Sequence, residues 1–103
     1  MDSPYEYLIK HMQEISKNQE ILRKIKIESL EKSNVSEVTI YKKLEEIGIK
    51  LDEFTPKIAN CTLNNQFLSE SDNIIIAKRN SEFNENFEKL KALKLLWYIN
   101  NNG

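Results

Sequence analysis

The sequence predicts a mainly α-helical fold with a small β-hairpin. Its 103 residues include only two glycines and two prolines, fewer than a protein built from many tight turns needs. Apolar residues recur at helical spacing through most of the chain. The exception is the run from Ile74 to Lys78, whose β-branched residues favour a strand. We therefore expect helices on both sides of a hairpin, within one domain that covers residues 1–103.

The N-terminal segment, residues 4–32, is predicted to be helical. Residues 3–6, Ser-Pro-Tyr-Glu, have the pattern of a capping box with proline at the first helical position. A weak interruption near Asn18 leaves two alternatives open, one long helix or two shorter ones. A coiled coil is disfavoured, because the heptad register that collects the apolar residues puts His11 and Asn18 at its second core position.

Residues 33–47 are predicted to form a turn followed by a second helix. Ser36 is a suitable N-cap for this helix, and Gly48 supplies a left-handed residue that ends it. The segment 49–80 is then predicted to hold an extended piece and the hairpin. For residues 49–68, strand and helix both remain open.

The last helix is predicted over residues 81–99, with Ser81 as its cap. Its apolar face consists of Phe83, Phe87, Leu90, Leu93 and Trp97. Residues 95–99 are apolar on every side of the helix, so they need cover from the domain or from a partner chain.

The composition argues against several classes of function. The 15 Lys and Arg residues nearly balance 16 Asp and Glu residues, so bulk electrostatic binding to nucleic acid or membranes is not expected. No apolar run is long enough to span a membrane, and the acidic start lacks the positive charge of a signal peptide, which predicts a cytoplasmic protein. The single cysteine, Cys61, and the single histidine, His11, predict neither a metal site nor a cofactor, and Cys61 is expected to be a buried thiol. No convergent set of titratable groups predicts an enzyme.

One motif points to DNA. Residues 35–44, Val-Ser-Glu-Val-Thr-Ile-Tyr-Lys-Lys-Leu, resemble the turn and recognition helix of helix-turn-helix proteins such as TetR-type repressors and resolvases. The resemblance extends over residues 30–47. It implies that Val35 fills the turn, that Ile40 and Leu44 pack against the preceding helix, and that the outer face enters the major groove of double-stranded DNA.

The resemblance also assigns candidate contacts with DNA. On the recognition helix these are Ser36, Glu37, Val38, Thr39, Tyr41, Lys42 and Lys43. Two strands after a recognition helix are the order of a winged helix, in which Lys78 and Arg79 would contact phosphates. The sequence departs from the family where Leu30 replaces a usual alanine and Asn34 a usual glycine. Glu37 also brings an acid close to the phosphates.

The leading hypothesis is a sequence-specific DNA-binding protein that acts as a homodimer, because one recognition helix contacts few base pairs. A transcription regulator or a plasmid maintenance or transfer factor fits this reading. The abundance of Lys, Asn and Ile, whose codons are AT-rich, favours a mobile element or an AT-rich bacterial genome as the source. The alternative is a small helical protein–protein interaction module, such as a phage inhibitor or an immunity protein. Loss of Lys42 and Lys43 would abolish binding by a DNA reader and leave such a module almost unaffected.

Overall fold

The computed structural model describes residues 4–29 and 35–102, with the side chains of residues 5–25 and 35–93. Within these ranges four helices follow one another: α1 (Pro4–Ser29), α2 (Val35–Asp52), α3 (Thr55–Leu63) and α4 (Glu70–Asn102). The predicted mainly α class is confirmed. The predicted β-hairpin is wrong, because the described ranges contain no strand. Ser3, of the predicted capping box, lies outside them.

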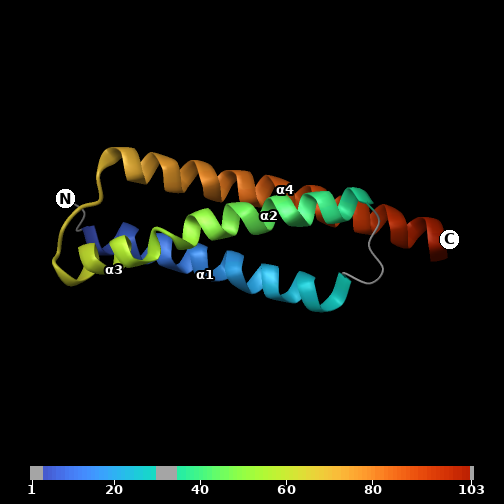
Figure 1. Ribbon diagram of the computed structural model, residues 1–103, viewed down its shortest axis with the longest axis horizontal. Helices are drawn as coiled ribbons and strands as arrows, with labels where there is room; N and C mark the ends of the chain where they lie inside the picture. Colours follow the sequence, from blue (N-terminus) through green and yellow to red (C-terminus); the bar gives the residue numbers. More distant parts are fainter. Residues whose placement is uncertain (1–3, 30–34, 103) are drawn as a thin grey trace.

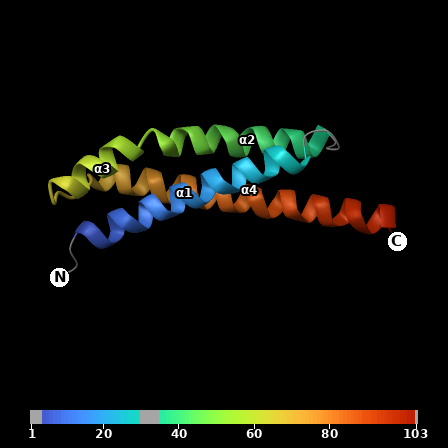
Figure 2. The same cartoon turned by 90° about the horizontal axis from the view of Figure 1, so that it is seen from below.

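The helices pack along one another in an elongated bundle that measures 54 × 23 × 18 Å. The first and last helices, α1 and α4, run in the same direction, and α2 and α3 return in the opposite one (Figures 1 and 2). The beginnings of α1 and α4 lie at the same end of the bundle as α3, whereas α4 extends beyond the other end in both views. None of the described helices combines the length and apolar character needed to cross a membrane.

The core is built from apolar residues that recur along α1, α2 and α4 at spacings of three, four and seven. Such residues lie on one side of a helix and pack against neighbouring helices. The buried members are Leu8, Ile15 and Leu22 on α1, Tyr41, Leu44, Ile47 and Leu51 on α2, and Ile76, Phe83 and Leu90 on α4. The predicted apolar face of the last helix is confirmed at Phe83 and Leu90, which are buried, and at Phe87, which packs against the core.

The isoleucine run belongs to the beginning of α4 and not to a strand. Ile76 is fully buried on the core side of α4, so the packing of an amphipathic helix outweighs the β-propensity of the run. The cap of this helix is Ser69, whose Oγ accepts a 3.1 Å hydrogen bond from the backbone N–H of Asp72. In the predicted hairpin, residues 69–73 would be the loop before the strand at Ile74. Ser81, predicted to begin the last helix, lies inside it, and the strand order of a winged helix is absent from the described residues.

Residues 62–68, for which strand and helix were both open, are the end of α3 followed by a short loop. The backbone N–H of Gln66 donates to the carbonyl of Cys61 at 2.9 Å, and that of Asn65 donates to the carbonyl of Thr62 at 3.4 Å. This is a Schellman motif, and Asn65 takes the left-handed conformation it needs, with φ of 52°. The buried thiol predicted for Cys61 is confirmed.

Gly48 lies inside α2 and does not end it. The helix continues to Asp52, and α3 follows with Pro56 in its first turn, so the predicted extended piece is also helical. A Cβ atom at Gly48 would lie 2.6 Å from Cδ1 of Leu22, and Nε2 of Gln19 donates a 3.0 Å hydrogen bond to the Gly48 carbonyl. The glycine therefore allows α1 and α2 to approach closely, which is a different use from the left-handed end that was predicted.

Of the two alternatives for the N-terminal segment, the structure has the single helix. Asn18 is buried, and its Nδ2 donates a 2.8 Å hydrogen bond to Oδ1 of Asn80 on α4. One heptad earlier, a 3.0 Å hydrogen bond joins Nε2 of His11 and Oδ1 of Asn73. The two polar residues that argued against heptad packing therefore face α4, where each has a polar partner.

Candidate functional site

The predicted recognition helix is the first half of α2, and its candidate contacts are divided between surface and interior. Ser36, Thr39, Lys42 and Lys43 are exposed, and Val38 is half-buried. Glu37 and Tyr41, predicted to lie on the outer face, are buried with relative exposures of 5% and 8%. Glu37, Tyr41 and Leu44 are spaced four and three residues apart, so they lie on the same side of α2, which faces the core.

The arrangement of α1 and α2 differs from that of a helix-turn-helix. In that motif two short helices cross at a large angle, whereas α1 and α2 lie antiparallel along the bundle (Figure 2). Val35, predicted to fill the turn, is 83% exposed at the first position of α2. The predicted turn itself, with Leu30 and Asn34, lies outside the described residues.

The predicted wing contacts are on α4. Lys78 is exposed and Arg79 is half-buried. The next residue, Asn80, is hydrogen-bonded to Asn18 on α1. The residue after Asn18, Gln19, donates a hydrogen bond to the carbonyl of Gly48 on α2. This part of α4 therefore lies at the level of Gly48, whereas the lysine pair of α2 is nearer the start of that helix. The structure does not bring the two basic pairs together.

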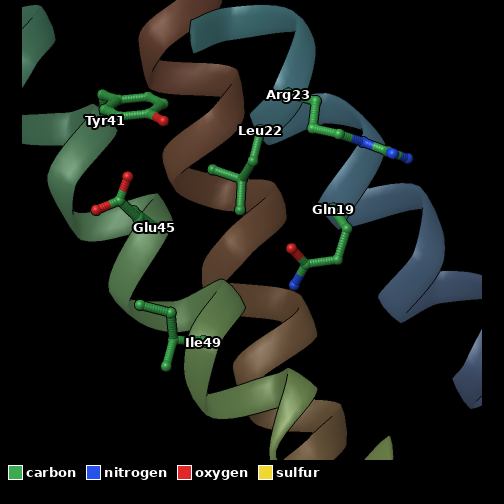
Figure 3. A pocket seen from close by; sticks show the side chains of 6 residues that line it. All are labelled: Gln19, Leu22, Arg23, Tyr41, Glu45 and Ile49. Carbon is green, nitrogen blue, oxygen red and sulfur yellow. The ribbon is translucent and has the colours of Figure 1, made fainter.

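A shallow pocket of about 160 Å³ lies between α1 and α2 (Figure 3). Its lining consists of Gln19, Leu22, Arg23, Tyr41, Glu45 and Ile49. Burial raises the pKa of Tyr41, and the hydrogen bond to Glu45 and the charge of that carboxylate raise it further. The phenol therefore stays protonated at neutral pH and serves as a hydrogen-bond donor. In Figure 3 the guanidinium of Arg23 points away from this pair.

A group of exposed apolar side chains lies at the end of the bundle where α1 and α4 begin and α3 ends. We call this group the α3-end surface; it consists of Tyr5 (54% exposed), Leu63 (85%), Phe67 (63%) and Ile74 (60%). The sequence does not predict this surface, because it leaves residues 62–68, which include Leu63 and Phe67, open between a strand of the hairpin and a helix. Large apolar residues on both sides of the polar sequence Asn64-Asn65-Gln66 were the available signal.

The loop that carries Phe67 is held in place by contacts with α1. The ring of Phe67 stacks on that of Tyr7, with 6.1 Å between the centroids. The hydroxyl oxygen of Tyr7 accepts a 2.8 Å hydrogen bond from the backbone N–H of Leu68, whose side chain is buried. Phe67 is therefore displayed by an anchored loop.

An ion pair joins α3 to α4 near the same end. Nζ of Lys57 lies 2.6 Å from Oδ2 of Asp72. This contact raises the pKa of Lys57 and lowers the pKa of Asp72, because each charge stabilises the other. The pair links α3 to the first turn of α4.

Among the described residues, no three His, Cys, Asp or Glu side chains are grouped closely enough to hold a metal ion. The chain matches no protein-family model, and no curated protein or solved structure shows significant similarity to it.

Proposed function

We propose that the protein is a helical protein–protein interaction module that binds its partner through the α3-end surface. The observation that carries the proposal is the exposure of four large apolar side chains at one end of the bundle. Exposed apolar patches mark contact sites with other molecules. Aromatic residues such as Phe67 are among those that contribute most to the affinity of protein interfaces.

The chemistry of this surface favours an apolar protein partner over a nucleic acid. None of its four defining side chains is charged, and the nearby Lys57 and Asp72 neutralise each other. Binding to a phosphate backbone depends on several cationic groups. Binding to an apolar partner depends on the area removed from water, which exposed Leu63 and Phe67 supply.

DNA binding is the second candidate. The observation that favours it is the exposure of Ser36, Thr39, Lys42 and Lys43 on α2. The burial of Glu37 and Tyr41 removes two of the predicted contacts. A homodimer that reads double-stranded DNA as a regulator or plasmid factor would therefore rely on a small part of α2, and we rank it below the interaction module.

The proposal is tested by affinity capture from cells that encode the chain, with proteins quantified by mass spectrometry. The test variant is Leu63→Ser with Phe67→Ser. The matched control is Val35→Ser with Ile49→Ser, which removes two exposed apolar side chains elsewhere on the bundle. We expect a protein that the wild type and the control capture equally and that the test variant loses. Equal capture by all three would contradict the proposal.

The DNA candidate is tested with the same wild-type protein by selection from a random duplex library at near-physiological salt. Under our proposal no sequence is enriched, and Lys42→Glu with Lys43→Glu leaves partner capture unchanged. Enrichment of a defined site that this double variant no longer binds would replace the proposal with the DNA candidate. We also infer a cytoplasmic location, which the free thiol of Cys61 supports.

A further inference from the structure

The pocket between α1 and α2 is small (Figure 3). Its volume is about 160 Å³, which at ~30 Å³ per water molecule is the space of about five water-sized groups. Pockets that hold cofactors or drug-sized ligands measure roughly 300–1,000 Å³. Leu22, which is buried, and Ile49, which is 58% exposed, give this pocket apolar walls. It therefore suits a short chain of a few carbon atoms better than a cofactor.

The hydrogen bonds of the polar lining leave mainly acceptors free. Nε2 of Gln19 donates a 3.0 Å hydrogen bond to the carbonyl of Gly48. Oε1 of Gln19 accepts no hydrogen bond from any residue that the structure describes. The hydroxyl of Tyr41, which its raised pKa keeps protonated, donates to the carboxylate of Glu45. This carboxylate can accept from further donors, because it has about four lone-pair sites. The lining therefore favours a ligand that donates hydrogen bonds.

The uncompensated charge at the pocket is negative. The carboxylate of Glu45 forms no ion pair within the described part of the chain, whereas that of the next residue, Glu46, pairs with Lys50. Arg23 also lines the pocket, but its guanidinium pairs with Glu20. Figure 3 shows this guanidinium directed away from Glu45. A cation beside Glu45 would therefore gain an ion pair without breaking one.

We propose that this pocket binds a primary ammonium group on a short aliphatic stem. Such a group has three N–H donors and no acceptor, so it can donate to both Glu45 and Oε1 of Gln19. Its stem would lie along Leu22 and Ile49, in the way that the carbons of a lysine side chain lie along apolar surfaces. A four-carbon stem with its nitrogen has the size that the volume admits. A carboxylate ligand would instead be repelled by Glu45.

Free alkylamines and the lysine side chains of other proteins share this chemistry, and two probes distinguish the two sources. Butylammonium represents the free amine, and Nα-acetyl-lysine N-methylamide represents a lysine within a polypeptide. Both are cations at neutral pH, because such ammonium groups titrate near ~10.4. The test is an NMR titration of the full chain that follows the methyl signals of Leu22 and Ile49. We expect saturable shifts with a dissociation constant on the order of 10 mM for butylammonium, since a ligand of so few atoms binds weakly.

Two further ligands carry the same butyl stem with a different polar group. Butanol is uncharged, and pentanoate is negatively charged. We expect butanol to bind ~3-fold more weakly than butylammonium, because it forms no ion pair with Glu45. Pentanoate should cause no saturable shift. Equal affinities for butylammonium and butanol would overturn the proposal.

Glu45→Gln is the test variant, and its exposed position means that the change should not disturb folding. It should bind butylammonium ~3-fold more weakly than the wild type does and bind butanol with unchanged affinity. Glu46→Gln is the matched control, because it removes the same charge from the neighbouring exposed residue, which pairs with Lys50. The control should bind butylammonium like the wild type. Equal losses in the two variants would overturn the proposal, since general electrostatic attraction would then account for binding.

The pocket is separate from the α3-end surface. Gln19 lies about four turns after Tyr5 on α1, ~21 Å along the helix axis. Glu45→Gln therefore leaves the α3-end surface intact, and either proposal can fail without the other. Shifts with both probes would assign the pocket to both sources of the ammonium group, and shifts with one probe would assign it to that source. The absence of a saturable shift with either probe up to about 100 mM would overturn the proposal.

Discussion

Asn18 on α1 and Asn80 on α4 form a 2.8 Å hydrogen bond between their side chains in the interior of the bundle. The hydrogen bond between His11 and Asn73 lies one heptad earlier on both helices. A slip of either helix by one turn would break both hydrogen bonds and bury unpaired polar groups. The two polar pairs therefore fix the register in which α1 and α4 run parallel, in the way that a buried asparagine fixes the register of a coiled coil.

The Asn18–Asn80 pair is expected to contribute more to specificity than to stability. Asn80→Ala should lower the free energy of unfolding by about 1–3 kcal/mol, because it leaves the amide of Asn18 buried without its acceptor. Replacing both residues with leucine should restore or exceed wild-type stability, since the Nδ2 group of Asn80 has no hydrogen-bond partner among the described residues. Urea unfolding of the wild type, Asn18→Leu, Asn80→Leu and the double leucine variant measures this as a thermodynamic cycle. Additive losses in the double variant would contradict the account.

Gly48→Ala is expected to destabilise the protein, although alanine favours helices by ~1 kcal/mol over glycine. The new Cβ would lie 2.6 Å from Cδ1 of Leu22, so the Leu22 side chain or the two helices would have to shift. Overpacking of this kind costs about 1–3 kcal/mol, so we expect a net loss of ~1 kcal/mol in thermal or urea unfolding. Leu22→Val should relieve part of the loss when it is combined with Gly48→Ala. A single variant that is more stable than the wild type would show that α1 and α2 are not in close contact at this position.

Ser69→Ala is expected to lower stability by ~1 kcal/mol, because it removes the side-chain acceptor of the Asp72 N–H at the beginning of α4. Ser81→Ala is the matched control. This serine is exposed in the middle of the same helix, where alanine has the higher helix propensity, so the control should be neutral or slightly stabilising. The free energy of unfolding of the two variants decides between this structure and the predicted one. A larger loss for Ser81→Ala would favour a helix that begins at Ser81.

The ion pair between Lys57 and Asp72 gives stability a defined dependence on pH. The pKa of Asp72 is lower in the folded protein than in the unfolded chain, so the unfolded state binds its proton at higher pH. The stabilisation is therefore present above the unfolded pKa of about 4 and is lost as the pH falls through the folded pKa. Lys57, whose pKa is raised, loses its contribution only as the pH rises above about 10.4.

The stability of Asp72→Asn is expected to fall less than that of the wild type when the pH is lowered. Urea midpoints measured between about pH 3 and pH 7 should fall less steeply for this variant than for the wild type. Glu53→Gln, at an exposed position, serves as a control for the loss of one carboxylate. Identical pH profiles of Asp72→Asn and the wild type would show that the ion pair does not contribute to folding in solution.

The helical class and much of the core could be predicted from the sequence, because the spacing of residues such as Phe83 and Leu90 depends only on helix geometry. The start of α4 was also present in the sequence, as the Ser-x-x-Asp cap at Ser69. The sequence nevertheless favours a hairpin at this point, because a serine-rich segment before three isoleucines also fits a turn followed by a strand. Local propensity could not decide between these readings. The choice between strand and helix depends on the burial of Ile76 against the other helices, which are distant in sequence.

The candidate site was harder to predict, because it depends on which side of each helix meets its neighbours. The resemblance predicts that Tyr41 lies on the outer face of the recognition helix. In the structure Tyr41 lies on the same side of α2 as Leu44, and both side chains are buried. His11 and Asn18 argue against a coiled coil in the sequence, because their polar partners on α4 are sixty-two residues away and no local pattern reveals them. The α3-end surface brings together the ends of separate helices, which no local pattern reveals.

We propose that the α3-end surface contacts a protein partner and that α2 does not contact DNA. The most direct measurement is photocrosslinking in cells that encode the chain, with a benzophenone amino acid in place of either Phe67 or Lys43. We predict a protein adduct from position 67 and none from position 43. A DNA adduct from position 43, with no adduct from position 67, would contradict the claim.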